Sequence, residues 1–574
     1  MKRILKYMKG YGKECVLGPL FKLLEATFEL FIPLVVAAIV DTGIANKDQS
    51  YIVRMCLVMI SLGVIGLICA ITAQFFAAKA AVGFSARLRH AVMGHILGCS
   101  YTTIDEGGTS TMVTRMTSDI NQVQNAVNLT LRLLLRSPFV VFGAMIMAFT
   151  IDFRSALVFA GLIPVLCLVV FGIMLITMPM YKGVQGNLDG VTSATRQNLT
   201  GVRVLRAFCM EQQQVEAFKQ KVDGLMVSQL RAGRISALMN PITFVLVNLA
   251  VVVLIHVGAI RVEEGILTQG MVIALYNYMT QILVELIKMA NLIITMTKGV
   301  ACGNRIADVL DTPREKKHIN KIGKLCGRVE FADVAAVYAG ASAPSLENIS
   351  FVAEPGQTIG VIGGTGSGKT TLVELIPGFY SASSGRVLVD GQDVSAVDAE
   401  SLREQIGVVP QKAVLFQGTI RENLLWGRPD ATAEELWQVL DIAQAKEVVE
   451  GKEGGLDALV EQGGANFSGG QRQRLTIARA LVRNPAVLIL DDSASALDYA
   501  TDAKLRMAIR GMENAPTTFI VSQRAASVRY ADMILVLDDG QLVDSGTHDQ
   551  LLEHCDVYQE IYYSQFRKEV VQNG

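Results

Sequence analysis

Charge is scarce in this 574-residue chain, and the charge that is present balances. Asp, Glu, Lys and Arg together make up 18% of the residues, and the formal net charge is −1. A chain without a basic excess has no bulk attraction for nucleic acid, so we expect no nucleic-acid partner. The nine cysteines are scattered, with no C-x-x-C pair and no Cys/His spacing typical of a zinc site. They suit a reducing compartment rather than a disulfide framework.

Apolar residues are abundant instead. They make up 51% of the chain, and the mean hydropathy is +0.38, above the range of ordinary soluble domains. The length predicts two to four domains. The apolar excess lies in the first half as long runs, whereas the second half has mixed polarity. This asymmetry predicts a membrane domain followed by a soluble one.

Six apolar stretches of the first half are long enough to cross a hydrocarbon core of ~30 Å. They lie at about residues 15–40, 52–78, 129–150, 155–178, 242–262 and 270–297. The first stretch is too long for the apolar core of a signal peptide. The basic segment 1–10 is predicted to lie on the inner membrane surface as an amphipathic helix. The chain is therefore expected to be a multi-pass protein of the cell membrane, with the lipid bilayer as a partner.

The charges of the connecting segments predict the orientation. The short connections 46–50, 151–154 and 261–265 carry few Lys or Arg, whereas the long segments 79–128 and 179–241 carry many. By the positive-inside rule the two long segments are cytoplasmic, and an even number of spans places both termini on that side. Their helical spacing indicates membrane helices that extend into the cytosol.

Five ionisable residues fall inside the apolar spans. Lys22, Glu25 and Glu29 share one face of a helix, and Glu285 and Lys288 form an i, i+3 pair. Charge in a bilayer is costly, so it faces a partner or a wet cavity. Two interpretations stay open: these residues line a translocation pathway, or they neutralise one another at a helix contact.

The second half is organised around a phosphate-binding loop that satisfies G-x-x-x-x-G-K-[ST]. A strand-like run precedes it and a helix-like run follows it. Its glycines let backbone N–H groups surround the phosphates of a nucleotide, its lysine adds a positive charge and its threonine hydroxyl can hold Mg²⁺. The residues expected to bind the nucleotide are Gly363, Gly364, Thr365, Gly366, Ser367, Gly368, Lys369, Thr370 and Thr371. ATP and Mg²⁺ are the expected cofactors.

The organisation around this loop predicts the domains. A membrane domain is expected over 1–310, a polar linker over 311–326 and a nucleotide-binding domain over 327–574. In the last segment, strand-like runs alternate with amphipathic helices, which predicts an α/β domain with a mainly parallel sheet.

Further motifs follow the loop in a fixed order. Gln411 ends a strand, and Asp491 ends a buried one where it can hold Mg²⁺ together with Thr370. The segment 495–498 (Ser-Ala-Leu-Asp) follows, and Gln523 ends a later strand. Between Gln411 and Asp491, a serine and two glycines precede a helix and make an anion site at its N-terminus. This motif comprises Ser468, Gly469, Gly470 and Gln471.

Together these motifs resemble an ATP-binding-cassette (ABC) ATPase, and the six spans ahead of them resemble a half-transporter of the ABC exporter family. The resemblance implies an all-α membrane domain of six transmembrane helices with cytosolic extensions, fused to an α/β nucleotide-binding domain. It further implies that segments 104–119 and 201–211 carry coupling helices that dock on nucleotide-binding domains. Tyr338 matches the aromatic residue that stacks on adenine, and Gln411 matches a residue that reaches Mg²⁺ or the attacking water.

Two positions depart from the family pattern. The catalytic Glu after Asp491 is replaced by Asp492, and the switch histidine by Gln523. The shorter carboxylate lies about 1.5 Å farther from the attacking water, and glutamine carries no positive charge. Both changes act on the γ-phosphate, so we expect a site that binds Mg-ATP and hydrolyses it slowly. The chain would then be the degenerate-site subunit of a heterodimeric, multidrug-type exporter.

The signature 468–471 is complete, with Phe467 in place of the usual leucine. In an ABC dimer each ATP lies between one chain's phosphate loop and the other's signature, so this chain should complete an active site on a partner half-transporter. The expected substrate is small and amphipathic. Two alternatives remain: an importer of siderophore- or haem-type compounds with the exporter fold, and an ATP-gated regulatory subunit without net transport.

Overall fold

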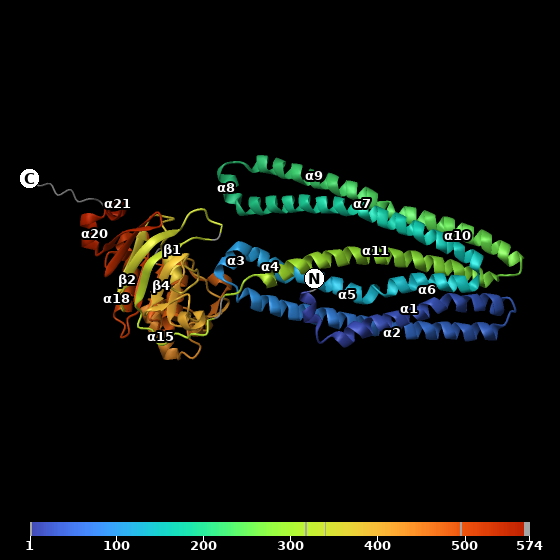
Figure 1. The fold of residues 1–574 in the computed structure, drawn as a ribbon, viewed down its shortest axis with the longest axis horizontal. Helices are drawn as coiled ribbons and strands as arrows, with labels where there is room; N and C mark the ends of the chain where they lie inside the picture. The colour runs from blue at the N-terminus through green and yellow to red at the C-terminus, as the bar shows by residue number, and fades with distance from the viewer. Residues whose placement is uncertain (1–2, 316–317, 339, 494–495, 567–574) are drawn as a thin grey trace, which may run out of the picture. The chain divides into compact units, whose positions relative to one another are not determined.

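A computed structural model describes residues 3–315, 318–338, 340–493 and 496–566 (Figure 1). The chain divides into two compact units. The first comprises Met1–Leu97 with Thr109–Thr312, and the second comprises Gly98–Gly108 with Pro313–Gly574. The segment 98–108 lies within the range predicted for the membrane domain, and in the structure it groups with the second unit, where Tyr101 stacks on Phe379.

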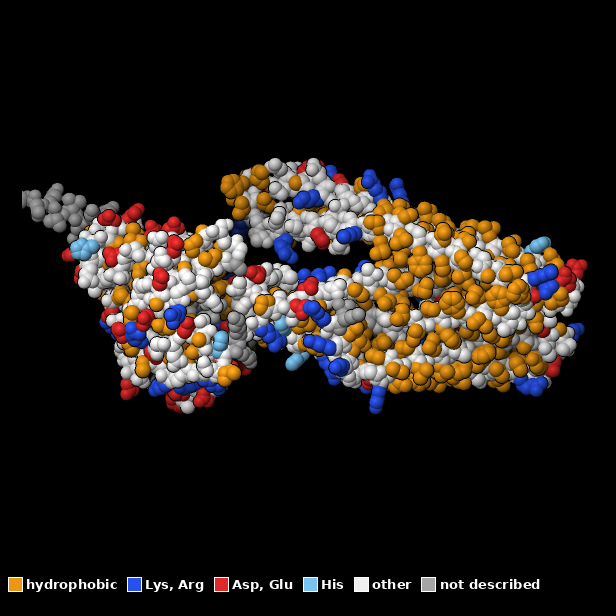
Figure 2. Space-filling view, in the orientation of Figure 1, with side chains coloured by type: hydrophobic (Ala, Val, Ile, Leu, Met, Phe, Trp, Pro, Cys, Tyr) orange, Lys and Arg blue, Asp and Glu red, His pale blue; other side chains and the backbone are white. Residues whose placement is uncertain are grey.

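The first unit consists of helices. Within the described residues, six helical stretches are long and apolar enough to cross a membrane, as expected. They run over Gly12–Ile44, Gln49–Ile96, Thr109–Ile151, Phe153–Thr200, Glu211–Glu263 and Gln269–Asp311. Figure 2 shows apolar side chains covering one part of these helices almost continuously, while charged side chains gather beyond that part. This distribution is typical of membrane helices that continue into water.

Several of these stretches are divided into shorter elements. The unit comprises η1 (Ile4–Met8), α1 (Gly12–Ala38), η2 (Ile39–Ile44), α2 (Gln49–Ile96), α4 (Thr109–Thr114), η3 (Arg115–Asp119), α5 (Ile120–Leu133), α6 (Arg136–Ile151), α7 (Phe153–Thr200), α8 (Val202–Ala207), α9 (Glu211–Ala237), α10 (Met239–Glu263) and α11 (Gln269–Asp311). The predicted N-terminal amphipathic helix is a five-residue 3₁₀ helix, η1, whose Ile4 is buried against Phe84 and Leu88 of α2. Its main apolar contact is therefore with protein.

The ionisable side chains of the spans are paired. Lys22 and Glu25 form an ion pair at 2.6 Å within α1. Arg136 at the start of α6 binds Glu29 of α1 at 2.6 Å and also binds Glu285 of α11. Lys288 and the hydroxyl of Ser137 also bind Glu285, each at 2.8 Å. These contacts agree with the interpretation that the ionisable residues neutralise one another where helices meet. Sequence reasoning missed Arg136, the cation that joins three helices.

The second unit is built on a six-stranded sheet with the order β12-β11-β3-β10-β9-β6. All its neighbouring pairs are parallel except β11 with β12. The strands are β3 (Thr358–Gly363), β6 (Ile406–Val409), β9 (Val487–Asp491), β10 (Thr517–Val521), β11 (Met533–Asp538) and β12 (Gln541–Gly546). The α/β domain with a mainly parallel sheet is thereby confirmed.

A second, antiparallel sheet with the order β2-β1-β4-β5 and a small β7-β8 pair complete the strands. These strands are β1 (Val329–Ala336), β2 (Leu346–Ala353), β4 (Ser384–Val389), β5 (Gln392–Asp393), β7 (Gly418–Thr419) and β8 (Leu459–Val460). The helices of the unit are α3 (Tyr101–Gly107), α12 (Lys369–Leu375), α13 (Ala399–Arg403), α14 (Ile420–Leu425), α15 (Ala433–Ile442), α16 (Lys446–Glu450), η4 (Gly455–Asp457), η5 (Gln462–Gly464), α17 (Gly469–Val482), α18 (Tyr499–Arg510), α19 (Ala525–Val528), α20 (His548–His554) and α21 (Asp556–Gln565).

The parallel sheet is buried on both faces. In β9, Val487 and Ile489 join one apolar cluster while Leu488 and Leu490 join the other. This explains why the strand is a continuous apolar run rather than an alternating one. Because parallel strands end at the same edge, the segments that follow β3, β6, β9 and β10 are brought together there.

Candidate nucleotide-binding and hydrolysis site

The carboxyl edge of the parallel sheet holds a pocket of about 360 Å³. It collects predicted site residues from five separate segments of the chain. The residues that line it are Tyr338, Ser345, Thr365, Gly366, Gly368, Lys369, Thr370, Thr371, Gln411, Asp491, Asp492, Val521, Ser522 and Gln523. Ser345 was not predicted, since no local pattern distinguishes it. The pocket is the geometric centre of the candidate site.

The phosphate-binding loop has the backbone that its glycines permit. Gly366 and Gly368 have φ angles of 85° and 91°, in the left-handed region that side chains disfavour. At Gly363 a Cβ atom would lie 2.1 Å from the carbonyl oxygen of Leu537. The loop therefore turns tightly between β3 and α12, a geometry in which backbone N–H groups face a phosphate.

Lys369 lies inside this loop and is 8% exposed. Its ammonium group donates to the carbonyl oxygen of Gly363 at 3.0 Å and also to that of Gly364. Burial lowers the pKa of Lys369, and the charges of Asp491 and Asp492 oppose that shift. The side chain is thus held where it can bind phosphate oxygens.

The residues present fit a magnesium ion. The Thr370 hydroxyl donates to the two carboxylate oxygens of Asp491 at 3.2 and 3.1 Å. Gln411 donates to Asp492 at 3.2 Å. Hydroxyl, carboxylate and amide oxygens are ligands that Mg²⁺ prefers, with nucleotide phosphates and water completing its shell. Within the described residues no cluster of three or more His, Cys, Asp or Glu that could hold a metal ion is found.

The charges around Asp491 also fit a magnesium site. Burial raises the pKa of Asp491, and the adjacent charge of Asp492 raises it further. Two carboxylates this close repel each other, and a divalent cation relieves the repulsion. When bound, Mg²⁺ neutralises charge on the β- and γ-phosphates; Thr370, Gln411 and Asp491 are the residues that would hold it.

The two unusual residues lie beside each other at the ends of β9 and β10. Asp492 has a φ of 43°, and its backbone N–H donates to the carbonyl oxygen of Val521 at 3.0 Å. The carbonyl oxygen of Gln523 accepts from Gln565 of α21 at 2.8 Å, and Gln565 also accepts from the N–H of Ala525 at 2.9 Å. Gln565 was missed because its role depends on tertiary contacts alone.

The signature lies outside the pocket. Ser468 caps α17 by accepting from the N–H of Gln471 at 3.3 Å, while the Gln471 side chain accepts from the N–H of Ser468 at 2.9 Å. Phe467 is 4% exposed, so the apolar replacement is accommodated in the core. Ser495 of the following loop lies outside the described residues, and Asp498 caps α18. The pocket and the signature are thus two separate surfaces.

Known proteins share this arrangement over its full length. Residues 15–286 match the model of the ABC transporter transmembrane region, and residues 346–495 match the ABC transporter model. An uncharacterized ABC transporter ATP-binding protein of Bacillus subtilis, YfiB, is 35% identical over 570 residues, covering 99% of each chain.

This chain belongs to the ABC transporter family. The ATP-dependent lipid A-core flippase of Escherichia coli is 27% identical over 546 residues, covering 95% of this chain and 94% of the flippase. A bacterial Atm1-family ABC exporter solved with ATP bound has the same fold, with a TM-score of 0.81 at 22% identity, over 97% of this chain and 99% of that one.

The transporter therefore joins a multi-pass membrane domain to an ABC ATPase domain. It is an ABC transporter chain with the transmembrane region and the ATPase domain in one polypeptide, and its fold is that of an ABC exporter half-transporter. An ABC ATPase domain binds ATP, normally with Mg²⁺.

Tyr338 is the residue that the family resemblance assigned to adenine stacking. It lines the pocket, and its hydroxyl is 3.0 Å from that of Thr371 at the start of α12. Its ring meets the ring of Tyr380 edge-on, with centroids 5.1 Å apart. Burial raises the pKa of Tyr338, so its phenol stays neutral at physiological pH.

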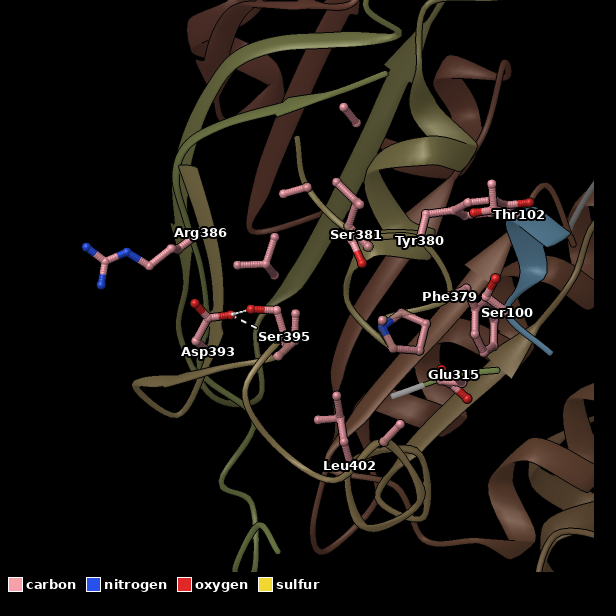
Figure 3. Close-up of a pocket in the computed structure, with 18 of the residues that line it drawn as sticks. Ser100, Thr102, Glu315, Phe379, Tyr380, Ser381, Arg386, Asp393, Ser395 and Leu402 are labelled. Atoms are coloured by element: carbon pink, nitrogen blue, oxygen red, sulfur yellow. Dashed lines mark hydrogen bonds between the residues drawn. The ribbon is translucent and has the colours of Figure 1, made fainter. Parts of the chain in front are cut away.

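Helix α3, in the segment between the second and third apolar helical stretches, packs within the second unit. Tyr101 stacks on Phe379 with ring centroids 4.5 Å apart, and the Tyr380 hydroxyl donates to Asp105 at 2.5 Å. Figure 3 shows Tyr380 and Phe379 beside Ser100 and Thr102, around a cavity of about 680 Å³. This loop therefore contacts a nucleotide-binding domain, as the family resemblance implied. Tyr380 was missed because its partners are distant in sequence.

Proposed function

We propose that this transporter subunit is one half of a heterodimeric ATP-driven exporter. Its own ATP site binds Mg-ATP and hydrolyses it slowly, and its signature completes the hydrolytic site of the partner subunit. The ATPase domain and both termini lie in the cytoplasm. The substrate is small and amphipathic, such as a drug, lipid or peptide.

The observation that carries this proposal is the pair of replacements at the pocket edge. Asp492 and Gln523 end the neighbouring strands β9 and β10, where a γ-phosphate and the attacking water would meet. Asp492 also accepts a hydrogen bond from Gln411 at 3.2 Å, so its short side chain is directed to Gln411. A misplaced general base forfeits about 10²–10⁴ in rate.

The binding machinery supports retention of nucleotide. Lys369, Thr370, Gln411 and Asp491 are the family's residues for phosphate and Mg²⁺, and all four line the same pocket. The chain's residues can therefore bind and orient Mg-ATP while the step that needs a well-placed base is slow.

The position of the signature supports a second, different subunit. Ser468 and Gly469 are exposed at the start of α17 and do not line the chain's own pocket. A capped helix N-terminus with exposed glycine N–H groups suits a phosphate presented by another chain. A second copy of this chain would supply another slow ATP site. A different subunit, with Glu and His at the positions equivalent to Asp492 and Gln523, would supply a fast one.

An amphipathic substrate is supported by the apolar side chains that dominate the membrane helices (Figure 2) and by the pairing of their charges. The relatives named as lipid A-core flippases act on an amphiphile. The basic segments between the spans support the cytoplasmic orientation.

The test compares the full chain with the double variant D492E/Q523H, each purified alone in lipid nanodiscs. We expect wild-type ATP turnover to be slow and the double variant to turn over about 10²-fold faster, with unchanged ATP affinity. Brisk turnover by wild type, equal to that of the double variant, would overturn the slow-site proposal.

A second assay is needed to determine the direction of transport and to distinguish a transporter from an ATP-gated regulatory subunit. The chain is co-purified with the half-transporter encoded beside it and reconstituted into vesicles with the ATPase domains outside. ATP-dependent accumulation of an amphipathic dye supports export. Loss of dye from preloaded vesicles indicates import, and dye leakage that needs bound but not hydrolysed ATP indicates a gate.

A further inference from the structure

The segment that follows β10 carries Gln523, one of the two unusual residues of the pocket. Ser522 still belongs to the sheet, because its N–H donates to the carbonyl oxygen of Val361 in β3 at 3.1 Å, and it is 1% exposed. Gln523 comes directly after it and lines the pocket. The position of the Gln523 side chain therefore depends on what holds the backbone beyond Ser522.

A single side chain of α21 holds that backbone. The Gln565 amide nitrogen donates to the carbonyl oxygen of Gln523 at 2.8 Å, and the Gln565 amide oxygen accepts from the N–H of Ala525 at 2.9 Å. Arg524, which lies between the two bonds, has an extended backbone with φ −92° and ψ 116°. A neighbouring strand would bind the same two backbone groups. Gln565 thus takes the place of a strand where β10 ends.

Gln565 is exposed, but the helix that carries it is packed. Helix α21 contacts α19, β3 and β11. Its Tyr558 is fully buried, with the hydroxyl 2.8 Å from Nδ1 of His548. Tyr562 and Phe566, close to Gln565 in the chain, stack with ring centroids 4.7 Å apart and pack against an apolar cluster of the unit. The Gln565 side chain is therefore presented from a fixed helix end.

The other supports of this segment act on different residues of it. The hydroxyl oxygen of Ser522 accepts from the N–H of Arg524 at 3.0 Å, and Arg506 of α18 donates to the carbonyl oxygen of Ser527 at 2.6 Å. In the described part of the chain, the bond from Gln565 is the only one to the carbonyl oxygen of Gln523. Loss of Gln565 would therefore free residue 523 before any other part of the segment.

We propose that Gln565 is a positioning residue of the nucleotide site and fixes the side chain of residue 523 toward the γ-phosphate. The inference rests on the proposed function, because it requires that residue 523 face the γ-phosphate. A shift of the backbone at this position moves the side chain that meets the phosphate. Helix α21 is then part of the hydrolysis machinery, although none of its residues lines the pocket.

The test uses the full chain with D492E/Q523H in nanodiscs, because the faster turnover of that variant makes a loss measurable. Adding Q565A should lower steady-state ATP turnover about tenfold, since a misplacement of ~1 Å costs up to about 100-fold in rate. The affinity for a fluorescent ATP analogue should stay unchanged, because Lys369, Thr370 and Asp491 hold the nucleotide. The melting temperature should also stay unchanged.

Two variants of α21 separate the bond to Gln523 from the stability of the helix. Q559A is the matched control, because Gln559 lies on the same helix and donates to the carbonyl oxygen of Leu552 at 2.8 Å. It should turn over ATP as the D492E/Q523H parent does. Q565E keeps an acceptor for the N–H of Ala525 and loses the donor to residue 523, so it should lower turnover as much as Q565A does.

A double-mutant cycle then shows whether Gln565 acts through residue 523. In D492E/Q523A the side chain that Gln565 positions is gone, so adding Q565A should change hydrolysis by less than about twofold. Single-turnover measurements with radiolabelled ATP follow the slow reaction of these variants. A general loosening of the ATPase unit would instead lower hydrolysis equally in the two backgrounds.

The outcomes distinguish this inference from the proposed function. If D492E/Q523H hydrolyses ATP no faster than wild type, the slow-site proposal fails and the inference fails with it. If D492E/Q523H is faster and Q565A leaves its turnover unchanged, the inference is overturned while the proposed function stands. Equal losses in Q565A and Q559A, or in the two backgrounds of the cycle, overturn it in the same way. If Q565A does not fold, Q565E supplies the same comparison.

Discussion

At the residue scale, this transporter's chemistry depends on a few side chains at the ends of β3, β9 and β10. Lys369, Thr370 and Asp491 keep the groups that a bound Mg-ATP needs. We propose that Asp492 and Gln523 lack the reach and the charge that fast hydrolysis needs. On that proposal, nucleotide binding and nucleotide hydrolysis depend on different residues of this site.

The substitution Lys369→Met should weaken nucleotide binding without unfolding the chain. A charge-assisted hydrogen bond contributes about 1.5–3 kcal/mol, so ATP affinity should fall by about 10–100-fold. Titration with a fluorescent ATP analogue measures this. The matched control is Lys452→Met, because Lys452 lies against Phe467 rather than in the pocket; equal losses in both variants would contradict the assignment.

Glu374 should make stability depend on pH. Burial, followed by the charges of Asp491 and Asp105, raises its pKa from 4.5 to about 7. The folded chain thus holds this proton more tightly than the unfolded chain, so stability falls as pH rises from about 4.5 to 7 and stays low above pH 7.

The variant Glu374→Gln removes that dependence. It should melt at a higher temperature than wild type at pH 8 and at the same temperature at pH 5, as followed by intrinsic fluorescence of the full chain. Glu347→Gln, at an exposed position, is the control. A Glu374→Gln variant less stable than wild type at pH 8 would contradict the shifted pKa.

At the element scale, helices α1, α6 and α11 of the membrane unit are joined by charge. Arg136 binds Glu29 and Glu285, and Glu285 is 3% exposed. Removing one partner of a buried ion pair leaves an uncompensated charge, whereas replacing the whole set by neutral residues is often tolerated. The cluster therefore makes the three helices interdependent.

Arg136→Met should destabilise the folded transporter by about 3 kcal/mol, because the buried Glu285 keeps only Lys288 as a counter-charge and Glu29 loses its arginine partner. The triple variant R136M/E29Q/E285Q should recover much of that loss. Both are measured as the yield of monodisperse protein and the melting temperature in detergent. Equal behaviour of the single and triple variants would show that the charges do not act as one cluster.

Helix α8, unlike the helices joined by Arg136, has no buried residue. Phe208, at its C-terminal end, is 73% exposed. Large exposed apolar side chains at a loop tip indicate a contact surface, and the family resemblance assigns this loop to a nucleotide-binding domain. Its function is therefore complete only in the dimer.

At the scale of the whole molecule, the pair of subunits should respond unequally to matched changes. Ser468→Arg in this chain should abolish ATP turnover of the heterodimer, because the arginine fills the space of the partner's phosphate. Lys369→Met in this chain should leave part of that turnover. Steady-state ATPase of the purified pair measures both, and equal losses would indicate two equivalent sites.

Much of this molecule could be predicted from the sequence alone, because its signals are local. A run of apolar residues long enough for a bilayer needs no tertiary context, and neither does a phosphate loop between a strand and a helix. All nine cysteines lie in the described residues, and each of them is free in the structure. Asp492 and Gln523 were identified by their positions after β9 and β10.

Contacts between distant segments could not be predicted in this way. In the sequence Arg136 stands at an apolar span with no charged partner nearby. Its partners Glu29 and Glu285 lie on α1 and α11, far from it along the chain. The resemblance implied that the loop around residues 104–119 docks on a nucleotide-binding domain, but the stacking of Tyr101 on Phe379 could be found only in the structure. Gln565 and Tyr380 act through partners more than 40 and 200 residues away.

The sequence by itself determined the spans, the ATPase motifs and the two departures at the γ-phosphate, since each follows from residue type and spacing along a short segment. The tertiary structure alone decided which charges pair in the membrane unit, where α3 packs and which side chain links it to Tyr338. Those facts depend on the side-chain packing of elements far apart in the chain, and no local pattern encodes that geometry.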